Sequence, residues 1–453
     1  MRLLSTTTLE FKETYHPEIT CYAILSHRWE KDEVGYEECV LSRQPDDLLP
    51  PWQVPGVRST CQKAGYRKIE TFCKCAKDLG FGWCWIDTCC IDKRSSAELS
   101  EAINSMWKWY QYADLCIVYL SDVSSLNSGG DALAKAFANS QWFRRCWTLQ
   151  ELLAPGILSF HDVDWNMFFE LMKALWFSGS ETNGMDDAMT AATRISQEDL
   201  RTFFSPGAHS IAQRMSWAAD RRATRVEDIA YSLLGLFDIN MPLLYGEGKK
   251  AFVRLQHEII RSSNDDSIFA WKHEAMTWNK TKIEGTEIFE DNRYHDVLNC
   301  PRWCVRSTFL ARSPADFRVC ERIASNPRGS CIDRRPHSIT NYGLELVTDC
   351  QVVHGPRSIN NREEFPEDRE DFPDDREVFL LELNCGYTAP SGFCRCMLVV
   401  EGSFFRKQDE RESFLLASRR LHCCDVGERT RDSYQRKTPS FLKHVTFYLP
   451  ISL

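Results

Sequence analysis

The stretch Tyr22-Ala-Ile-Leu-Ser-His-Arg-Trp29 has the composition of a short buried strand that ends in polar residues. Three other short segments share this β-branched and aromatic character: Trp83–Asp87, Leu115–Tyr119 and Ile157–Phe160. Between the segments, apolar residues recur at spacings of three and four, which predicts helices. Strands joined through helices need crossover connections, which favours a parallel sheet. Residues 1–165 are therefore expected to form an α/β domain, a largely parallel sheet flanked by helices.

The chain changes character twice after this domain. Residues 166–275 are expected to be a helical extension packed on the first domain, because apolar stripes recur at helical spacing. The first stripe consists of Phe168, Leu171, Met172 and Leu175. After about residue 300 the pattern shifts to period-two strands, at Val378–Leu383, Met397–Glu401 and His444–Leu449, so residues 276–453 are expected to form a β-rich domain. Within it, an acidic insertion at about 355–377 is expected to stay solvated and mobile, because its carboxylates repel one another.

Charge and hydropathy exclude two kinds of partner. The 453 residues carry a net charge of −9, whereas a protein that binds duplex DNA normally presents a basic face, so no nucleic-acid partner is expected. No apolar run approaches the ~18 residues of a membrane span, and the first residues turn polar too early for a signal peptide. A cytoplasmic protein without a membrane span is expected.

Twenty cysteines raise the question of a metal site. Their close pairs, such as Cys73/Cys75 and Cys89/Cys90, lack the Cys-x-x-Cys spacing with which two thiolates bind one zinc ion. No metal is therefore expected, and the thiols are interpreted as reduced and mostly buried. Gly246-Glu-Gly-Lys-Lys250 lacks the spacing of a phosphate-binding loop, so nucleoside triphosphate binding is not expected there.

Polar residues at the strand ends are the first candidates for a functional site. In α/β proteins, ligands usually bind at the carboxyl edge of the parallel strands. Ser26, His27 and Trp29 end the first strand, and Asp87 and Asp92 follow the second. The two carboxylates could bind a ribose, a cation or neighbouring arginines. Equally, the first group could only cap and cover its strand, and either aspartate could be an N-cap or loop brace.

The third candidate segment is Trp142-Phe-Arg-Arg-Cys-Trp-Thr-Leu-Gln-Glu-Leu-Leu-Ala-Pro155. Its spacing predicts a short helix on which Trp147 and Glu151 lie one turn apart, beside an apolar face. Partial burial of Glu151 would raise its pKa, which suits a carboxylate that meets developing positive charge. The alternative interpretation is a carboxylate on the helix surface, ion-paired with Arg144 or Arg145.

Together and in this order, these segments resemble the fungal heterokaryon incompatibility (HET) domain. The matching strings are Tyr22–Trp29, Trp85–Lys93 with Glu98–Met106, and Trp142–Pro155. Downstream, Met215–Arg225, Glu227–Tyr231 and Leu244–Gly248 look like the segment that follows this domain in fungal relatives. The resemblance implies a protein of vegetative self/non-self recognition whose domain triggers programmed cell death. It also implies self-association, or another incompatibility protein as the partner.

HET domains look in turn like Toll/interleukin-1 receptor (TIR) domains, some of which cleave NAD. The TIR motif Trp-Cys-x-x-Glu is similar to Trp147-Thr-Leu-Gln-Glu151, with Thr148 at the cysteine position. By this resemblance Glu151 would be catalytic, stabilising the ribosyl cation. Trp29 or Trp147 would stack on nicotinamide, and Ser26, His27 or Asp87 would contact the sugar. NAD would be a substrate, and no cofactor is expected.

Two functions stay open from the sequence. One is an NAD-consuming death effector, in which the carboxyl group of Glu151 is essential. The other is a non-enzymatic signalling module that acts by protein–protein contacts, in which the three motifs supply core and interface. Exposed apolar surface near Trp142 and Phe143 would favour the second function.

Overall fold

The computed structural model describes residues 1–43, 54–126, 129–174, 184–271, 309–325, 338–340, 343–353, 377–389, 392–406, 413–427 and 441–449. The chain divides into two compact units. Residues 1–208 and 220–251 form the first unit, and residues 209–219 and 252–453 form the second. The predicted boundary at residue 165 therefore falls inside the first unit.

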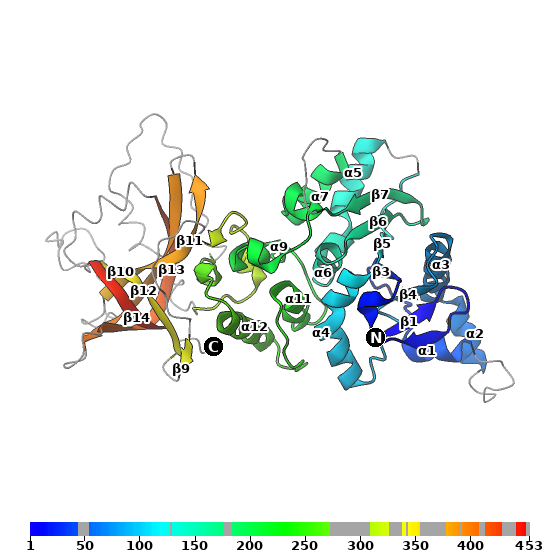
Figure 1. Cartoon of the computed structure of the whole chain (residues 1–453), viewed down its shortest axis with the longest axis horizontal. Coiled ribbons are helices and arrows are strands. Elements are labelled where there is room, and N and C mark those ends of the chain that lie inside the picture. Colours follow the sequence, from blue (N-terminus) through cyan, green and yellow to red (C-terminus); the bar gives the residue numbers. More distant parts are fainter. Residues whose placement is uncertain are drawn as a thin grey trace, which may run out of the picture. The chain divides into compact units, whose positions relative to one another are not determined.

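The first unit is built on a seven-stranded sheet with the order β2-β1-β4-β3-β5-β6-β7. Its strands are β1 Arg2–Ser5, β2 Phe11–Glu13, β3 Ala23–His27, β4 Trp83–Trp85, β5 Leu115–Tyr119, β6 Ile157–His161 and β7 Met167–Met172. The four central strands, β4-β3-β5-β6, pair in parallel, as the sequence predicted. The outer strands β2, β1 and β7 are antiparallel, so the sheet is mixed at both edges (Figure 1).

The strand β7 corrects the prediction of a helix from Phe168. A tight turn causes the reversal: the Asp162 carboxylate accepts hydrogen bonds from the backbone N–H groups of Asp164, at 3.0 Å, and Asn166, at 2.8 Å. Such a short connection can only produce an antiparallel pair. Phe169 and Leu171 are buried on one face of the strand. The predicted fourth member of the helical stripe, Leu175, lies outside the described residues.

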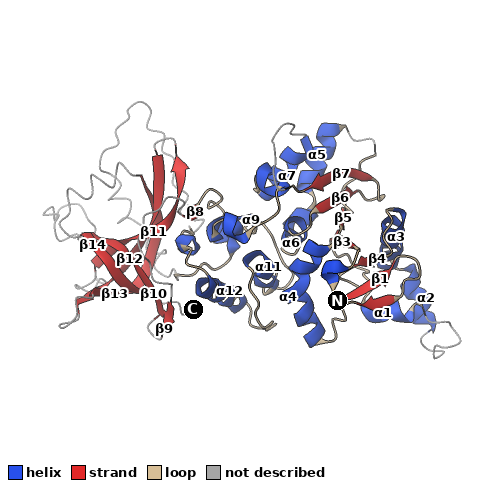
Figure 2. Cartoon of the chain, viewed as in Figure 1, coloured by secondary structure: helices blue, strands red, loops and turns tan. Residues whose placement is uncertain are grey.

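Helices cover both faces of this sheet (Figure 2). The α-helices in the described part of the first unit are α1 Tyr36–Leu41, α2 Val54–Gln62, α3 Ala64–Asp78, α4 Ser96–Tyr112, α5 Gly130–Asn139, α6 Thr148–Leu153, α7 Gly184–Thr193, α8 Gln197–Arg201, α10 Asp228–Tyr231 and α11 Leu234–Phe237. The start of α4 is stabilised by its N-cap residue, because the Ser95 hydroxyl accepts a hydrogen bond from the Glu98 N–H at 3.2 Å. The α/β fold class predicted from periodicity is thus confirmed.

Residues 220–251 are part of the first unit because they bind the segment before α6. The Arg222 N–H donates to the Arg144 carbonyl at 2.6 Å, and the Cys146 N–H donates to the Arg222 carbonyl at 2.9 Å. Further along, Glu227 Oε1 accepts the N–H groups of Gly246, at 2.9 Å, and Gly248, at 3.0 Å. A phosphate bound in this glycine loop would need these backbone N–H groups as donors. They are therefore already occupied, because they donate to the Glu227 carboxylate of the same chain.

The second unit contains α9 Ile211–Trp217, most of α12 Lys250–Ser262, and a second sheet. The order of this sheet is β8-β11-β12-β13-β14-β10-β9. Its strands are β8 Ala324–Ser325, β9 Ser338–Thr340, β10 Gly343–Val353, β11 Glu377–Ala389, β12 Gly392–Arg406, β13 Ser413–Gly427 and β14 Phe441–Leu449. The β-rich character predicted for this region is confirmed. The predicted acidic insertion lies outside the described residues, apart from its last residue, Glu377.

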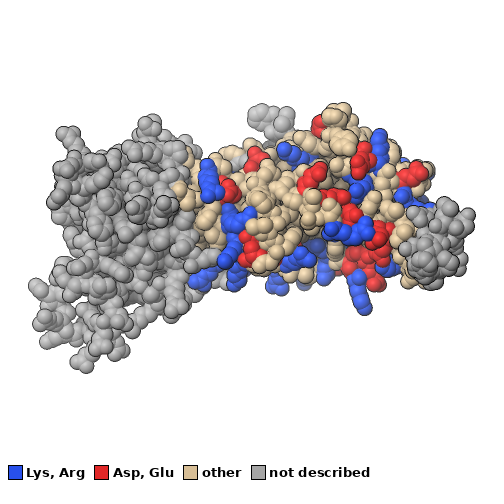
Figure 3. Space-filling view, turned by 90° about the horizontal axis from the view of Figure 1, so that it is seen from below, with Lys and Arg blue, Asp and Glu red and all other residues tan. Residues whose placement is uncertain are grey.

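Three features of the described residues bear on possible partners. Every helix in them is too short or too polar to cross a bilayer. Their histidines, cysteines and carboxylates form no group of three or more with the arrangement of a metal site. On the face shown in Figure 3, acidic and basic side chains are intermixed among the described residues rather than gathered into one basic stripe.

Candidate functional site

A buried hydrogen-bonded cluster lies at the carboxyl end of β3. The Ser26 hydroxyl donates to Glu151 Oε2 at 2.5 Å and accepts a hydrogen bond from Trp142 Nε1 at 2.8 Å. The Tyr110 hydroxyl, which donates to the Leu25 carbonyl at 3.0 Å, also lies within hydrogen-bonding reach of Glu151. A strand, a helix and the turn before a second helix thus converge on one carboxyl group.

Burial of the whole of α6 determines the chemistry of Glu151. All six residues of this short helix are buried, and Glu151 itself is 7% exposed. Loss of hydration raises its pKa to about 8, and the charge of Asp87 adds to the shift, whereas the Ser26 hydrogen bond and the charges of Arg145 and Arg221 oppose it. The alternative of a surface carboxylate is therefore wrong. At neutral pH the group is mostly protonated.

The position of α6 is fixed from its carboxyl end by a buried lysine. Lys173, directly after β7, donates from Nζ to the carbonyls of Leu152, at 2.8 Å, and Leu153, at 2.6 Å. These are among the last carbonyls of the helix, which have no partner within it. Burial lowers the pKa of Lys173 to about 7.

A second cluster, around His27, reaches the surface. His27 Nε2 lies 3.6 Å from Asp87 Oδ1, and Trp29 Nε1 donates to Asp87 Oδ2 at 2.7 Å. The Nζ atom of Lys93 lies 3.4 Å from the centre of the Trp29 ring. Burial, followed by the charges of Lys68, Arg145 and Lys93, holds the pKa of His27 well below its ordinary value, so its imidazole is neutral.

Five of the seven predicted site residues therefore gather at one edge of the sheet: Ser26, His27, Trp29, Asp87 and Glu151. Ser26 and His27 are consecutive on β3, so their side chains point to opposite faces of the sheet. Asp87, at the end of β4, connects the two clusters, because it contacts the Trp29 indole and its charge also reaches Glu151.

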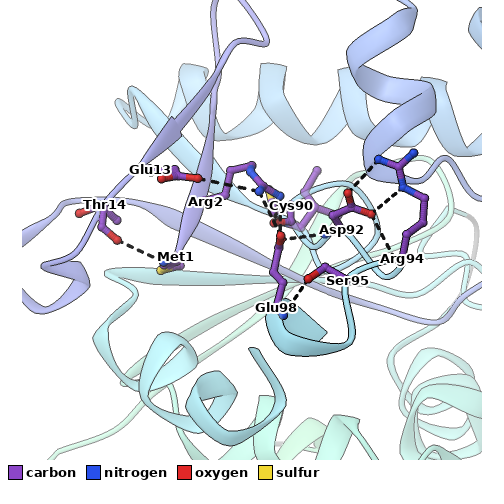
Figure 4. A network of polar contacts seen from close by, with 10 residues as sticks. Met1, Arg2, Glu13, Thr14, Cys90, Asp92, Arg94, Ser95 and Glu98 are labelled. Carbon is purple, nitrogen blue, oxygen red and sulfur yellow. Dashed lines mark hydrogen bonds and ion pairs between the residues drawn. The ribbon is translucent and has the colours of Figure 1, made fainter. Parts of the chain in front are cut away.

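Asp92 lies in a different network, drawn in Figure 4. Its carboxylate accepts from Arg94 Nε at 2.9 Å and Nη2 at 2.8 Å, which lowers the pKa of Asp92 to about 2. Its backbone N–H donates to Glu98 Oε1 at 2.8 Å, and Arg2 Nη1 donates to the same oxygen at 2.8 Å. The contacts of Asp92 are those of a loop brace, one of the two interpretations that the sequence left open.

Trp147 also has contacts other than those of the Glu151 cluster. It is half-buried at the start of α6, and its hydrogen bond to Asp228 helps to stabilise that carboxylate. Asp228 also accepts a hydrogen bond from the Tyr245 hydroxyl at 2.9 Å. Trp147 thus connects α6 to the segment 227–248, and a role in stacking on a substrate stays a prediction.

Several residues of the site were not selected from the sequence, and Trp142 and Arg221 are two of them. Trp142 lies within the third motif, and only its indole N–H, which needs an acceptor when it is buried, pointed to a hydrogen-bond partner. Arg221 and Arg222 form a basic pair, a pattern typical of a solvated surface, but Arg221 is buried. Arg221 Nη1 donates to Thr148 Oγ1 at 2.9 Å and to the Arg145 carbonyl at 3.0 Å, so it orients the start of α6.

Comparison with known protein families agrees with this geometry. Residues 22–136 match the family model described as "Heterokaryon incompatibility protein (HET)". These residues form a HET domain. A second match, to a domain of unknown function, DUF8212, covers residues 250–343. The HET match contains β3, β4 and β5, and therefore Ser26, His27, Trp29 and Asp87, whereas Glu151 lies beyond its end.

One curated relative is the "Vegetative incompatibility protein HET-E-1" of Podospora anserina, which is 40% identical over 260 residues. The match covers 56% of this chain and 17% of the relative, so this chain spans only a small part of the relative's length. No solved structure matches the chain, and the likeness to TIR domains stays a prediction.

The loop of the HET domain that carries Trp29 depends on close packing at Gly65. The Gly65 N–H donates to the Asp32 carbonyl at 3.1 Å, and a Cβ at this position would clash with the backbone of Asp32 and Glu33. Gly65→Ala is expected to destabilise the protein by about 2 kcal/mol. Denaturant unfolding followed by tryptophan fluorescence measures the loss. Gly82→Ala, whose Cβ would meet no atom within 4 Å, is the control, and equal effects of the two changes would contradict the packing argument.

Proposed function

We propose that this chain acts in vegetative incompatibility, and that its HET domain together with α6 triggers cell death by cleaving cytoplasmic NAD. The relative from Podospora anserina supports the biological role, because it is named a vegetative incompatibility protein. The observation that carries the chemistry is the buried Glu151 carboxyl group, with its raised pKa, at the carboxyl edge of a parallel sheet.

The proposed reaction breaks the bond between the ribose C1′ and the nicotinamide nitrogen. The bonding electrons leave with nicotinamide, which becomes neutral, and positive charge develops on the ribosyl ring. The Glu151 carboxylate stabilises this charge electrostatically. Water then attacks C1′, so that NAD and water yield ADP-ribose, nicotinamide and a proton. The hydroxyls of Ser26 and Tyr110 keep the carboxyl group oriented throughout.

The exposed ring of the second cluster suits the leaving group. Trp29 is 37% exposed, and its indole N–H is fixed by Asp87, so its ring is held at the edge of the site. A planar cationic nicotinamide stacks favourably on such a face, as Lys93 already does with its ammonium group.

Release of nicotinamide from NAD by the purified full-length chain tests this function directly. Concentrated protein, which favours any self-association, is expected to produce nicotinamide and ADP-ribose in equal amounts, separable by liquid chromatography. An inert protein that still kills when expressed in fungal cells would overturn the proposal.

The NAD-cleaving activity is also expected to rise with pH. Because kcat/KM reports ionisations of the free enzyme and the carboxylate is the useful form, activity should rise as Glu151 loses its proton. With a pKa of about 8, kcat/KM is expected to increase roughly tenfold per pH unit from pH 6 to 8 and then to level off. A profile that is flat or falls over this range would exclude Glu151 as the carboxylate that acts.

The non-enzymatic alternative lacks the surface that would favour it. Trp142 and Phe143 are 1% and 2% exposed, and Phe143 packs edge-on against Trp142 with ring centres 5.0 Å apart. These aromatic side chains belong to the interior of the first unit. Contact with a second copy or with another incompatibility protein, if it activates the enzyme, must therefore use other residues.

A further inference from the structure

Two cations at the edge of the site, Lys93 and Arg145, form no ion pair with a carboxylate among the residues that the structure describes. The Lys93 ammonium contacts the Trp29 ring, and the half-buried Arg145 guanidinium precedes α6. Over the described residues, neither is within 4.0 Å of an Asp or Glu oxygen. Both charges act on the same neighbour, since Lys93 and Arg145 each disfavour protonation of His27. Side chains that follow β4 and precede α6 therefore bring two positive charges to the end of β3.

The His27 imidazole is unsatisfied in the same place. Its side chain is 1% exposed, and over the described part of the chain neither ring nitrogen has a hydrogen-bond partner. Asp87 Oδ1, at 3.6 Å, is too far for a hydrogen bond. A buried polar group without a partner is costly, which indicates that a bound molecule supplies the missing acceptor.

Charges on the surrounding elements leave a positive excess. From α3, Lys68 faces His27, but it is ion-paired with Glu33 and so contributes little net charge. From β4, Asp87 offsets one of the two remaining cations, Lys93 and Arg145. Glu151 is mostly protonated at neutral pH because of its raised pKa. The balance of these groups favours an anionic ligand.

We propose that Arg145 and Lys93, with His27 beneath them, bind the diphosphate group of a nucleotide. The proposal rests on the NAD chemistry above for the choice of a diphosphate, because the charges by themselves favour an anion. Arginine can bind two phosphate oxygens at once, and lysine supplies a mobile point charge that can turn from the Trp29 ring to the ligand. The neutral imidazole can donate one N–H to a phosphate oxygen.

Calorimetric titration of the full-length chain tests this subsite without requiring catalysis. ADP, ADP-ribose and inorganic pyrophosphate are expected to bind, and adenosine is not. Arg145→Gln and Lys93→Gln are each expected to weaken ADP binding about tenfold to a hundredfold, the range for loss of one charge-assisted hydrogen bond. Lys12→Gln is the matched control, because Lys12 lies 5.1 Å from the Trp83 ring at the opposite end of β4. It should bind ADP as the wild type does.

A second measurement uses the wild type, so it tests the subsite even where the variants fail to fold. In the wild type, binding of pyrophosphate should move the NMR signals of the His27 ring, because a nearby anion favours protonation of the imidazole. His16, whose side chain is 71% exposed and pairs with Glu18, is the internal control and should not move. Pyrophosphate binding that depends on Arg145 and Lys93 would support the subsite whether it serves a dinucleotide or free diphosphates. ADP-ribose binding without pyrophosphate binding would overturn it.

Failure of this subsite and failure of the proposed reaction can be distinguished. A chain that binds ADP through Arg145 and Lys93 but never releases nicotinamide would retain the subsite and exclude the reaction. A chain that cleaves NAD while Arg145→Gln and Lys93→Gln leave both KM and ADP affinity unchanged would retain the reaction and exclude the subsite. Equal binding of adenosine and ADP would also exclude it, because adenosine carries no phosphate.

Discussion

Glu151→Gln is expected to lower nicotinamide release about a hundredfold to a thousandfold, the size of effect seen when one group that stabilises transition-state charge is removed. Glutamine has nearly the same shape and retains an acceptor oxygen for the Ser26 hydroxyl, but it can never carry the negative charge that the ribosyl cation requires. The measurement is the initial rate of nicotinamide release at pH 8.5, where the wild-type carboxylate is mostly ionised.

Glu170→Gln is the matched control for this change. Glu170 is exposed on β7 and is not part of the site. The same substitution there removes one negative charge from the surface and should leave the rate of nicotinamide release unchanged. The two functions left open by the sequence then separate in cells. A Glu151→Gln chain that remains as toxic as the wild type, at equal protein level, would contradict NAD cleavage as the cause of death and favour a signalling module.

Strand periodicity and the rule for carboxyl edges were sufficient to find the centre of the fold and most of the site. Short apolar runs such as Leu115–Tyr119 have the length and β-branched composition of buried strands, and parallel strands deliver their following residues to one edge. Ser26, His27 and Asp87 therefore came together as that rule requires. The edge strands were harder to predict. A segment as short as Met167–Met172 does not distinguish the two-residue period of a strand from the 3.6-residue period of a helix.

The remaining errors concern side chains whose partners lie far away in the sequence. Asp87 and Asp92 are five residues apart and chemically identical, but Trp29 contacts the first and Arg94 binds the second. In the same way Trp142 reaches Ser26, across 116 residues of sequence, while Trp147 turns to Asp228. Local patterns show that such groups exist, and only the packed structure decides which of them meet.

Glu151→Gln is expected to raise the free energy of unfolding relative to the wild type as pH rises, although it lowers activity. The ordinary glutamate pKa of about 4.3 describes the unfolded chain, whereas burial holds the folded value at about 8. Between these values the folded chain keeps a proton that the unfolded chain has lost, so the wild type becomes less stable as pH rises. Glutamine does not titrate. Relative to the wild type, the variant should therefore gain roughly 1.4 kcal/mol per pH unit, or about 4 kcal/mol between pH 5 and 8.

The difference between the two chains, rather than either curve alone, is the quantity to measure. Lys173, whose pKa burial lowers to about 7, makes the fold more stable as pH rises above 7, which masks part of the Glu151 effect. Both chains contain Lys173, so its contribution cancels when their denaturant midpoints are subtracted at each pH. The subtracted curve should be flat below pH 4, rise to about pH 8 and then level off. Parallel midpoints across this range would mean that Glu151 ionises freely in the folded protein, and its proposed role would lose its physical basis.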